Sequence, residues 1–307
     1  MRRFIITRTL LIVPTILGVV TLVFFFVHMV PGDPVVLMLG DYATPQEIQS
    51  MRHRLNLDRP LASQYGVYLD DLAHFDLGTS LYYKRPAAGI VIERFKYTFV
   101  LAVFAMLLSL LLSAPLGIVS AYKQGSWLDR VIEVTSVVGL SLPNFLIGIV
   151  LILIFSVRLN VLPVAGAQSA SSIVLPGLTL AVGMSTITIR MVRANMIAAI
   201  KHESFTADLA RGLSVNRALF VHALKATLIP VITLIGTQFG LLLSGAIVTE
   251  TVFSWPGIGK LLVDSVATRD YPLLNAAVLV IASVYVFVNL ATDIVYYMVE
   301  PRMRKHQ

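Results

Sequence analysis

The chain alternates between long apolar runs and polar connections. Six of the runs hold about 20 residues each, which is enough for a helix to cross roughly 30 Å of hydrocarbon. They cover residues 9–30, 98–122, 131–157, 173–189, 228–248 and 273–298. Because the runs are continuous rather than alternating, they predict helices and not the strands of a barrel. The pattern therefore predicts an all-α integral membrane protein with six transmembrane helices, the third of which contains Pro143 and should bend there.

The composition agrees with a protein that crosses the membrane several times. Of the 307 residues, 57% are hydrophobic and only 13% are charged, whereas a soluble domain has about 25% charged residues. So few charges cannot cover the surface of a soluble globule of this size. The chain has no cysteine, which excludes a disulfide framework, a thiolate metal site and a cysteine nucleophile.

Lys and Arg residues predict the orientation. Of the 24, 14 lie in the two termini and in the connections after the second and fourth runs. The long connection 31–97 is set aside, because long loops cross the membrane largely regardless of charge. The opposite side then keeps only Arg158, Lys260 and Arg269. We expect both termini in the cytoplasm, and we interpret the net charge of +7 as a topology signal rather than as a sign of nucleic-acid binding.

The connections divide the chain into units. Residues 1–30 form the N-terminus and first span, 31–97 an extracytoplasmic loop or subdomain, 98–298 the core, and 299–307 a cytoplasmic tail. The core includes a cytoplasmic connection at 190–227 and an extracytoplasmic one at 249–272. In the first loop, Thr44 followed by Pro45 and Glu47 is typical of a helix start and predicts a helix over 45–57. This loop is either a cap or docking surface at the outer mouth, or a spacer.

The cytoplasmic connection has the pattern of a compact helical knob. Residues 203–210 can form a two-turn helix, and Gly212 lies where a left-handed residue should end it. We expect an apolar face formed by Phe205 and Leu209, with Asp208 and Arg211 pointing elsewhere. Such a knob could enter a groove of a partner protein, or the helix could simply rest in the membrane interface.

Two groups of residues are candidates for a translocation path. In the third run, a proline frees a backbone carbonyl, and its polar neighbours either satisfy that carbonyl or line a wet path; the residues are Ser141, Pro143 and Asn144. In the connection 249–272, aromatic residues beside Pro and Gly predict either an interfacial anchor with Trp255 at headgroup depth or a gate. This second group is Glu250, Phe253 and Trp255.

Two further features concern the last two runs. Asp293 is an ionisable group inside an apolar run, which predicts either proton coupling or a buried structural pair with Asn289. Gly236, Gly240 and Ser244 recur every four residues, and such a stripe predicts close helix packing, within this chain or against a second membrane subunit.

Sequence motifs for catalysis are absent. The chain has no phosphate-binding loop, HExxH or GxSxG motif, and its histidines lack zinc-like spacing. We therefore expect neither an enzyme nor a metal site. On the residues alone, an ion-coupled secondary transporter remains an alternative to a subunit driven by a separate energy source.

Several short motifs occur in a fixed order: FVHMVPGDP at 26–34, DLGTS at 76–80, RMVRANM at 190–196, ADLARGLS at 207–214, HALK at 222–225, ETVFSWPGIG at 250–259 and RDYP at 269–272. In this order and at these spacings, the chain resembles the membrane permease subunits of ABC importers of the dipeptide, oligopeptide and nickel class. It is similar to the permease type that has a large extracytoplasmic loop between spans one and two.

The resemblance implies the type I ABC importer permease fold in a bacterial or archaeal inner membrane, and a non-catalytic subunit that forms half of a translocation path. It implies a second permease, two ATP-binding subunits, an extracytoplasmic solute-binding protein and surrounding lipid as partners. The chain itself would hold no cofactor, since ATP and Mg would bind the ATPase subunits. The solute stays open among di- or oligopeptides, nickel chelates and glutathione-like molecules.

The resemblance also assigns a coupling helix that docks into an ATPase subunit. Its residues would be Glu203, Phe205, Thr206, Ala207, Asp208, Leu209, Ala210, Arg211 and Gly212. Gly212 matches the glycine of the general importer motif. Thr206-Ala207-Asp208 replaces the motif's Glu-Ala-Ala, and Lys225 stands in place of its proline.

Overall fold

The computed structural model describes residues 2–29, 34–39, 43–54, 56–243 and 246–299. Within these residues the chain is helical, and its only β-type pairing is an isolated bridge between Thr79 and Pro86. The prediction of an all-α fold is therefore confirmed for the part of the chain that is described.

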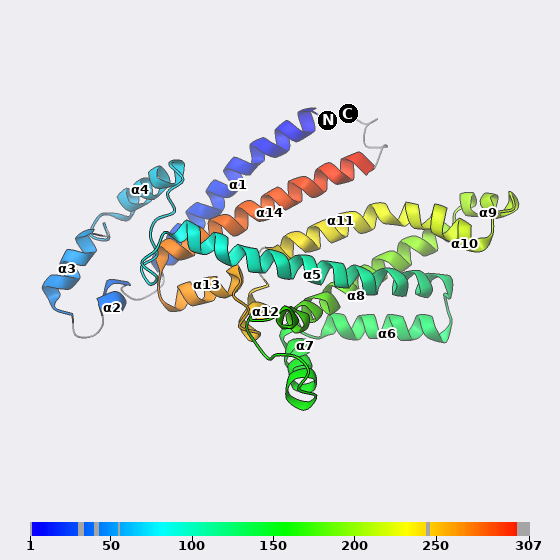
Figure 1. The fold of residues 1–307 in the computed structure, drawn as a ribbon. Coiled ribbons are helices and arrows are strands. Elements are labelled where there is room, and N and C mark those ends of the chain that lie inside the picture. The colour runs from blue at the N-terminus through cyan, green and yellow to red at the C-terminus, as the bar shows by residue number, and fades with distance from the viewer. Residues whose placement is uncertain (1, 30–33, 40–42, 55, 244–245, 300–307) are drawn as a thin grey trace.

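Five long helices form the body of the molecule (Figure 1). They are α1 (Arg2–Met29), α5 (Ala87–Tyr122), α8 (Val174–Lys201), α11 (Leu224–Leu243) and α14 (Tyr271–Val299). Helix α8 packs along α5, α11 contacts both α8 and α14, and α1 packs along α14. Buried apolar residues between α5, α8 and α11 form a core that includes Leu101, Leu180 and Leu242.

The helices differ in how well they meet the length and hydropathy expected of a membrane span. Three described segments are long and apolar enough: Ala87–Tyr122, Ala170–Lys201 and Tyr271–Tyr296. A bent pair of helices makes a fourth if it counts as one span. Two more segments, Leu10–Phe26 and Pro230–Leu243, are apolar but shorter. The structure thus gives three or four candidate spans on these criteria, and the number six stays a prediction.

The bent pair lies at the proline of the third apolar run. Helix α6 (Trp127–Ser141) ends before Pro143, and α7 (Asn144–Leu151) begins after it and continues as η1 (Ile152–Arg158), at an angle of 104° to α6. Leu142 is extended, with φ −87° and ψ 128°, because a following proline disfavours the helical conformation. The predicted kink at Pro143 is confirmed, and the helix axis turns there by more than a right angle.

Shorter helices lie toward opposite ends of the long ones (Figure 1). At one end are α2 (Pro34–Leu39), α3 (Pro45–Arg54) and α4 (Leu61–Ala73), together with α13 (Ile258–Ala267); at the other are α9 (Glu203–Ala210), α10 (Val215–Arg217) and η3 (Ala218–Ala223). The short helices η2 (Ala170–Ile173) and α12 (Ile247–Val252) lie between the long ones in the chain.

The cap predicted at Thr44 is present. The backbone N–H of Thr44 donates to the Glu47 carboxylate at 2.8 Å, and the N–H of Glu47 donates to the Thr44 hydroxyl at 3.4 Å. This reciprocal capping box satisfies N–H groups that the first helical turn leaves free. The helix runs from Pro45 to Arg54, and Asn56 and Leu57 lie in a turn, so the predicted range of 45–57 extends too far.

The first loop is attached to the long helices by aromatic and polar contacts. Tyr68 of α4 stacks on Phe24 of α1, with ring centroids 5.4 Å apart, and the hydroxyls of Tyr65 and Thr21 lie 2.6 Å apart. Asp270, which is completely buried, accepts hydrogen bonds from the Ser80 hydroxyl and from the N–H groups of Leu81, Tyr82 and Leu273. The loop is therefore fixed to the start of α14 as well as to α1.

A buried ion pair joins α6 to α8. Arg193 donates from Nε and Nη2 to the two carboxylate oxygens of Asp129, at 2.8 and 2.9 Å. The Ser120 hydroxyl and the Gly125 N–H also donate to this carboxylate. Two-point pairing between Arg and a carboxylate fixes orientation as well as distance, so this cluster sets how the α5–α6 turn lies against α8.

A second buried carboxylate, Glu250, caps the start of α13. The Glu250 Oε2 atom accepts from the N–H groups of Gly259 and Lys260, at 2.8 and 3.0 Å. The Thr98 hydroxyl donates to Oε1 at 2.6 Å and accepts from the Ile258 N–H at 2.8 Å. The first N–H groups of α13 thus find acceptors in two other helices, α12 and α5, where a helix N-terminus favours negative charge.

Burial is the main influence on the Glu250 carboxyl. It raises the pKa of this group, and the hydrogen bonds from Thr98, Lys260 and Gly259 partly offset the rise. The carboxyl lies so close to the following turn that a Cβ atom on Gly257 would come 2.2 Å from Glu250 Oε1. Gly257, the first of the two glycines in the WPGIG segment, is therefore required because the Glu250 carboxyl approaches it so closely.

We predict that Arg193→Met destabilises the protein strongly, because the Asp129 side chain, only 3% exposed, would lose the cation to which it is bonded. Breaking one side of a buried pair costs about 3–5 kcal/mol. The thermal unfolding midpoint of the purified protein in detergent should fall, and the double variant Asp129→Asn with Arg193→Met should recover part of the loss. An unchanged midpoint for the single variant would contradict this role of the pair.

We predict that Glu250→Ala lowers the unfolding midpoint more than Glu250→Gln. The alanine variant leaves the N–H groups of Gly259 and Lys260 buried without an acceptor, at about 1–3 kcal/mol for each group. Glutamine keeps the shape of the side chain and one acceptor oxygen. Both variants are measured by thermal unfolding in the same detergent, and equal midpoints for the two would argue against the cap.

Candidate functional site

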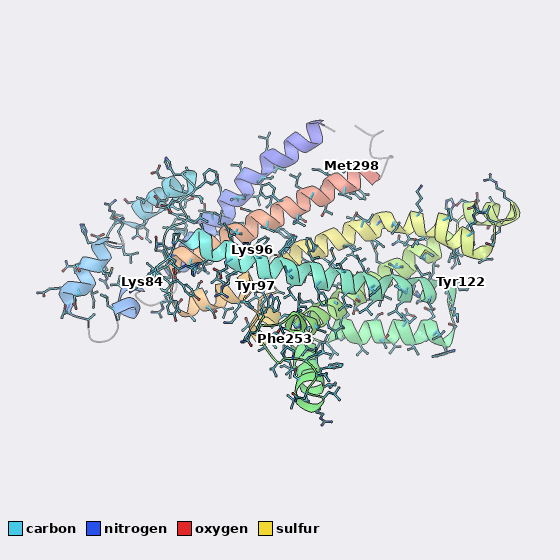
Figure 2. All side chains as sticks on the ribbon, viewed as in Figure 1. Lys84, Lys96, Tyr97, Tyr122, Phe253 and Met298 are labelled. Carbon is cyan, nitrogen blue, oxygen red and sulfur yellow. The ribbon has the colours of Figure 1, made fainter. Side chains whose placement is uncertain are left out.

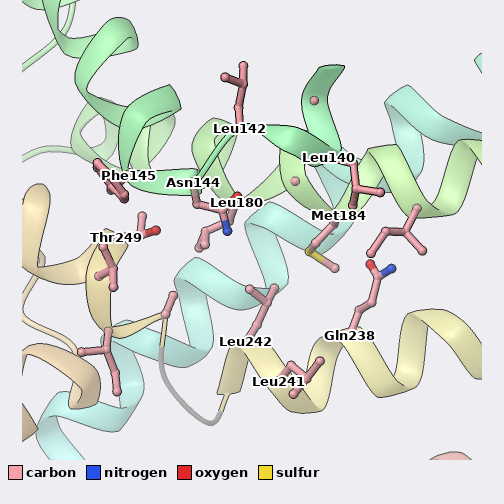
Figure 3. A pocket seen from close by; sticks show the side chains of 16 residues that line it. Leu140, Leu142, Asn144, Phe145, Leu180, Met184, Gln238, Leu241, Leu242 and Thr249 are labelled. Carbon is pink, nitrogen blue, oxygen red and sulfur yellow. The ribbon is translucent and has the colours of Figure 1, made fainter. Parts of the chain in front are cut away.

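The main cavity lies where the α6–α7 break faces α8, α11 and α12 (Figure 3). Its volume is about 690 Å³, within the range of sites that hold small molecules. Most of its wall is apolar. The lining residues are Gly139, Leu140, Leu142, Asn144, Phe145, Leu180, Gly183, Met184, Ile187, Gln238, Leu241, Leu242, Ala246, Ile247, Val248 and Thr249.

Three polar side chains interrupt the apolar wall: Asn144 of α7, Gln238 of α11 and Thr249 of α12. Gln238 is 8% exposed, and neither Nε2 nor Oε1 of its amide has a hydrogen-bond partner in the described part of the chain. Figure 3 shows its side chain extending from α11 toward Met184 of α8. Charged side chains are absent from the lining within the described residues, so the cavity presents neutral hydrogen-bonding groups there.

A second cavity of about 540 Å³ lies beside the first, between α5, α6, α8 and α11. Leu140 and Ile187 line both cavities. The second cavity is the charged one, because Glu133, Arg190 and Arg193 contribute to its wall. Together the two cavities extend along the side of the molecule formed by α6, α8 and α11. In the described residues, no three His, Asp or Glu side chains converge on a possible metal position.

The candidates from the third apolar run lie at the break between α6 and α7. Of the three, only Asn144 lines the main cavity. The Ser141 hydroxyl donates to the Val137 carbonyl at 3.0 Å. The carbonyl of Pro143 accepts from the N–H groups of Leu146 and Ile147 in the first turn of α7. These bonds satisfy the carbonyls of Val137 and Pro143, while the Asn144 side chain lines the cavity.

The candidates from the connection 249–272 lie inside the protein and not on its surface. Figure 2 labels Phe253 in the region where α12 and α7 meet. Glu250 caps α13, and Phe253, which is 2% exposed, packs against Gly148 of α7. Trp255 is 4% exposed, and its indole N–H donates to the Tyr97 carbonyl at 3.1 Å. The interpretation of Trp255 as an anchor at headgroup depth is wrong, because the folded chain covers it. These residues support the wall of the cavity from behind.

The glycine stripe of the fifth run contacts α14 of the same chain. A Cβ atom on Gly236 would come 2.4 Å from the Thr292 side chain, and one on Gly240 would touch Tyr285 and Val288 at 3.5 Å. Close packing within this chain therefore accounts for both glycines. Ser244 lies outside the described residues. Asp293 is half-buried on α14, and it lines neither of the two cavities.

The predicted knob is α9, with the expected bounds Glu203–Ala210. Gly212 has φ +85°, as predicted. The N–H of Gly212 donates to the Leu209 carbonyl at 2.9 Å and the N–H of Leu213 to the Asp208 carbonyl at 3.2 Å, which is the Schellman pattern at a helix C-terminus. At the other end, Nδ1 of His202 accepts from the Ser204 N–H.

The faces of α9 differ from the prediction in one respect. Phe205 is buried among Met196 of α8 and Leu219 of η3, as expected for an apolar anchor. The second buried residue is Asp208 and not Leu209, which is 37% exposed. The expected pairing of Phe205 with Leu209 on one buried face was therefore wrong. The two buried residues of α9, Phe205 and Asp208, are three positions apart and lie on the same face of the helix. The exposed surface of α9 therefore consists of Glu203, Ser204, Thr206, Ala207, Leu209 and Ala210.

Sequence reasoning missed Gln238 as a candidate, although a signal was present. A long amide side chain in the middle of the apolar run 228–248 is costly in a membrane unless it has a function or a partner. Our interpretation of that run was based on its small residues and not on its uncharged amide. Thr98 and Asp129 were missed for another reason, since their partners Glu250 and Arg193 lie 152 and 64 residues away in the chain.

Comparison with known proteins places these features in a family. Residues 113–305 match the family of binding-protein-dependent transport system inner membrane components, and residues 1–102 match the N-terminal region of membrane components of these systems. The glutathione transport system permease protein GsiC of Escherichia coli O6:H1 is 38% identical over 304 residues, which is 99% of each chain. The same protein of Pectobacterium atrosepticum is 40% identical over the same shares.

The fold is also similar to a solved structure. A chain of the MetNI methionine ABC transporter, in an inward-facing conformation, superposes with a TM-score of 0.59. The match covers 69% of this chain and 96% of that chain at 16% identity, so it supports the fold alone. Together with the family matches over nearly the whole length, these results identify the chain as a permease of the binding-protein-dependent ABC importers, a non-catalytic multi-pass component of the bacterial inner membrane.

Proposed function

We propose that this permease forms half of the translocation path of an ATP-driven importer for peptide-like solutes. Family membership favours ATP-driven import over the ion-coupled carrier that the residues alone left open. The permease has no cofactor of its own, and ATP binds the partner ATPases of such systems. We propose three further points: that this chain forms half of the translocation path, which subunits it assembles with, and which class of solute it transports.

The observation that carries the proposal is the main cavity with its unpaired amide. Leu140, Ile187 and Leu241 of the cavity wall are all more than two-fifths exposed, so the wall continues onto the surface of the chain. An unpaired polar group facing lipid costs several kcal/mol, which argues against lipid as the cover over Gln238. A second permease applied to the side formed by α6, α8 and α11 would enclose both cavities as one path.

The proposed topology has six spans with both termini in the cytoplasm, which is the orientation that the Lys and Arg distribution favours. The bent pair α6 and α7 then serves as one span, and Leu10–Phe26 and Pro230–Leu243 belong to two others. The loop 31–97 lies outside, where it offers a docking surface to a solute-binding protein. Helix α9 lies at the opposite end of the molecule from α3 and α4 (Figure 1) and therefore faces the cytoplasm.

The remaining partners follow from this arrangement. Two ATP-binding subunits would dock from the cytoplasm, one on α9 of this chain and one on the second permease. The exposed surface of α9 suits insertion into a groove, while Phe205 connects it to α8 and η3. ATP binding would move α9 and, through this anchor, bias the long helices toward the outward-open state. Glutathione and short peptides are the first solutes to test, because glutathione is transported by the similar permeases.

We predict that Ala207→Trp breaks docking of the ATPase subunit. Ala207 is exposed on α9, so an indole there obstructs a groove without disturbing the buried anchor Phe205. ATP hydrolysis stimulated by the loaded binding protein should fall at least about tenfold, which corresponds to a loss of about 1.4 kcal/mol. Ala207→Ser is the matched control and should keep the wild-type rate. Full stimulated hydrolysis and uptake with Ala207→Trp would contradict the docking role.

We predict that Gly212→Val uncouples ATP hydrolysis from uptake, whereas Gly212→Asn does so much less. A Cβ atom at this position meets open space, so the effect comes from the backbone. A β-branched residue at φ +85° is strained, while asparagine tolerates the left-handed region. Uptake per ATP hydrolysed is measured in proteoliposomes with the full complex. Equal coupling ratios for the two variants would show that the turn does not position α9.

A further inference from the structure

Two of the three polar side chains in the described lining of the main cavity are carboxamides. Apart from Thr249, its polar side chains are the carboxamides of Asn144 and Gln238, and the rest of the wall is apolar. Each carboxamide carries both a donor N–H₂ and an acceptor oxygen. The chemical complement of such a pair of groups is another amide, which also offers one donor and one acceptor.

Gln238 is the stronger indication of a ligand. Its side chain is more than nine-tenths buried, lines the cavity and has neither its donor nor its acceptor paired within the described residues. A buried amide without partners costs about 1–3 kcal/mol. A leucine would fill the same position at no such cost, so an unpaired glutamine is expected only where a partner arrives from outside the chain.

Asn144 is held at the cavity by the shape of the fold. It is the first residue of α7, directly after Pro143, so the break between α6 and α7 determines its position. On its other side it contacts α8 at Gly183, where a Cβ atom would come 2.6 Å from Asn144 Oδ1. The two carboxamides thus belong to different helices, α7 and α11, that border one cavity (Figure 3).

We propose that Gln238 and Asn144 form a subsite that binds the backbone amide of a peptide solute during its passage. This proposal rests on the proposed function and specifies the chemical group that the path reads. In the part of the chain that the structure describes, the lining includes no charged side chain, so it offers no counter-charge to the charged ends of a peptide or of a metal chelate. Two neutral hydrogen-bonding residues suit a transport path, because a solute must bind well enough to enter and weakly enough to leave.

The test uses the full complex in proteoliposomes with saturating loaded binding protein. The probes are radiolabelled glutathione, tri-alanine and a tri-alanine analogue in which an ester oxygen replaces one peptide N–H. Gln238→Leu should lower the uptake of amide probes about fivefold to tenfold, the effect of one lost hydrogen bond. It should also remove any preference for tri-alanine over its ester analogue. Thr237→Val is the matched control, since Thr237 is the exposed neighbour on α11 and bonds only its own helix at Thr233.

The possible outcomes separate this subsite from the proposed function. If the wild-type complex imports neither glutathione nor tri-alanine, peptide import is wrong and the subsite fails with it. If the wild type imports them and Gln238→Leu does so at the same rate, the subsite alone is overturned. If Gln238→Leu no longer co-purifies with the second permease, the amide pairs with that subunit and the subsite is again overturned. Normal co-purification with the second permease together with reduced, ester-tolerant uptake supports the proposal.

Discussion

The N–H groups at the start of α13 are buried, and the fold around the cavity depends on the Glu250 carboxylate and the Thr98 hydroxyl that accept their hydrogen bonds. Backbone groups inside a membrane protein must find partners within the protein. One carboxylate meets this requirement for α13 while it connects α12 to α5. Phe253 and Trp255 follow directly and pack behind the cavity, so a local hydrogen-bonding requirement fixes the position of its rear wall.

The buried carboxylates of this protein have hydrogen-bond partners within the chain, whereas the buried amide at the main cavity has none in the part that the structure describes. Asp129, Glu250 and Asp270 each accept several hydrogen bonds, and for each at least one donor lies far away in the sequence. Gln238 has no such partners in the described residues, although it is equally enclosed. Since paired groups hold the helices in place, the unpaired amide of Gln238 marks the main cavity as a place where a group from outside this chain can bind.

Features that depend on neighbouring residues were predicted well from the sequence. The helix 203–210, its left-handed Gly212, the cap at Thr44 and the break at Pro143 all follow from local backbone geometry and capping. The faces of α9 were predicted less well. The pattern paired Phe205 with Leu209, whereas contacts with α8 and η3 bury Phe205 and Asp208 instead. Periodicity identifies which residues share a face, but only packing decides which face is covered.

The sequence by itself determined the class of protein, because long apolar runs, few charges and ordered motifs do not depend on how the helices meet. It also determined where the helices break and end. Only the tertiary structure decided that Glu250 caps α13, that Arg193 pairs with Asp129, and that Gly236 touches α14. The Arg193–Asp129 pair spans 64 positions, and the Thr98 hydroxyl that completes the Glu250 cap lies 152 positions from Glu250. A hydrogen bond of that kind leaves no periodic signal in the sequence, and the glycine stripe does not say which helix it will meet, since both depend on the relative placement of whole helices.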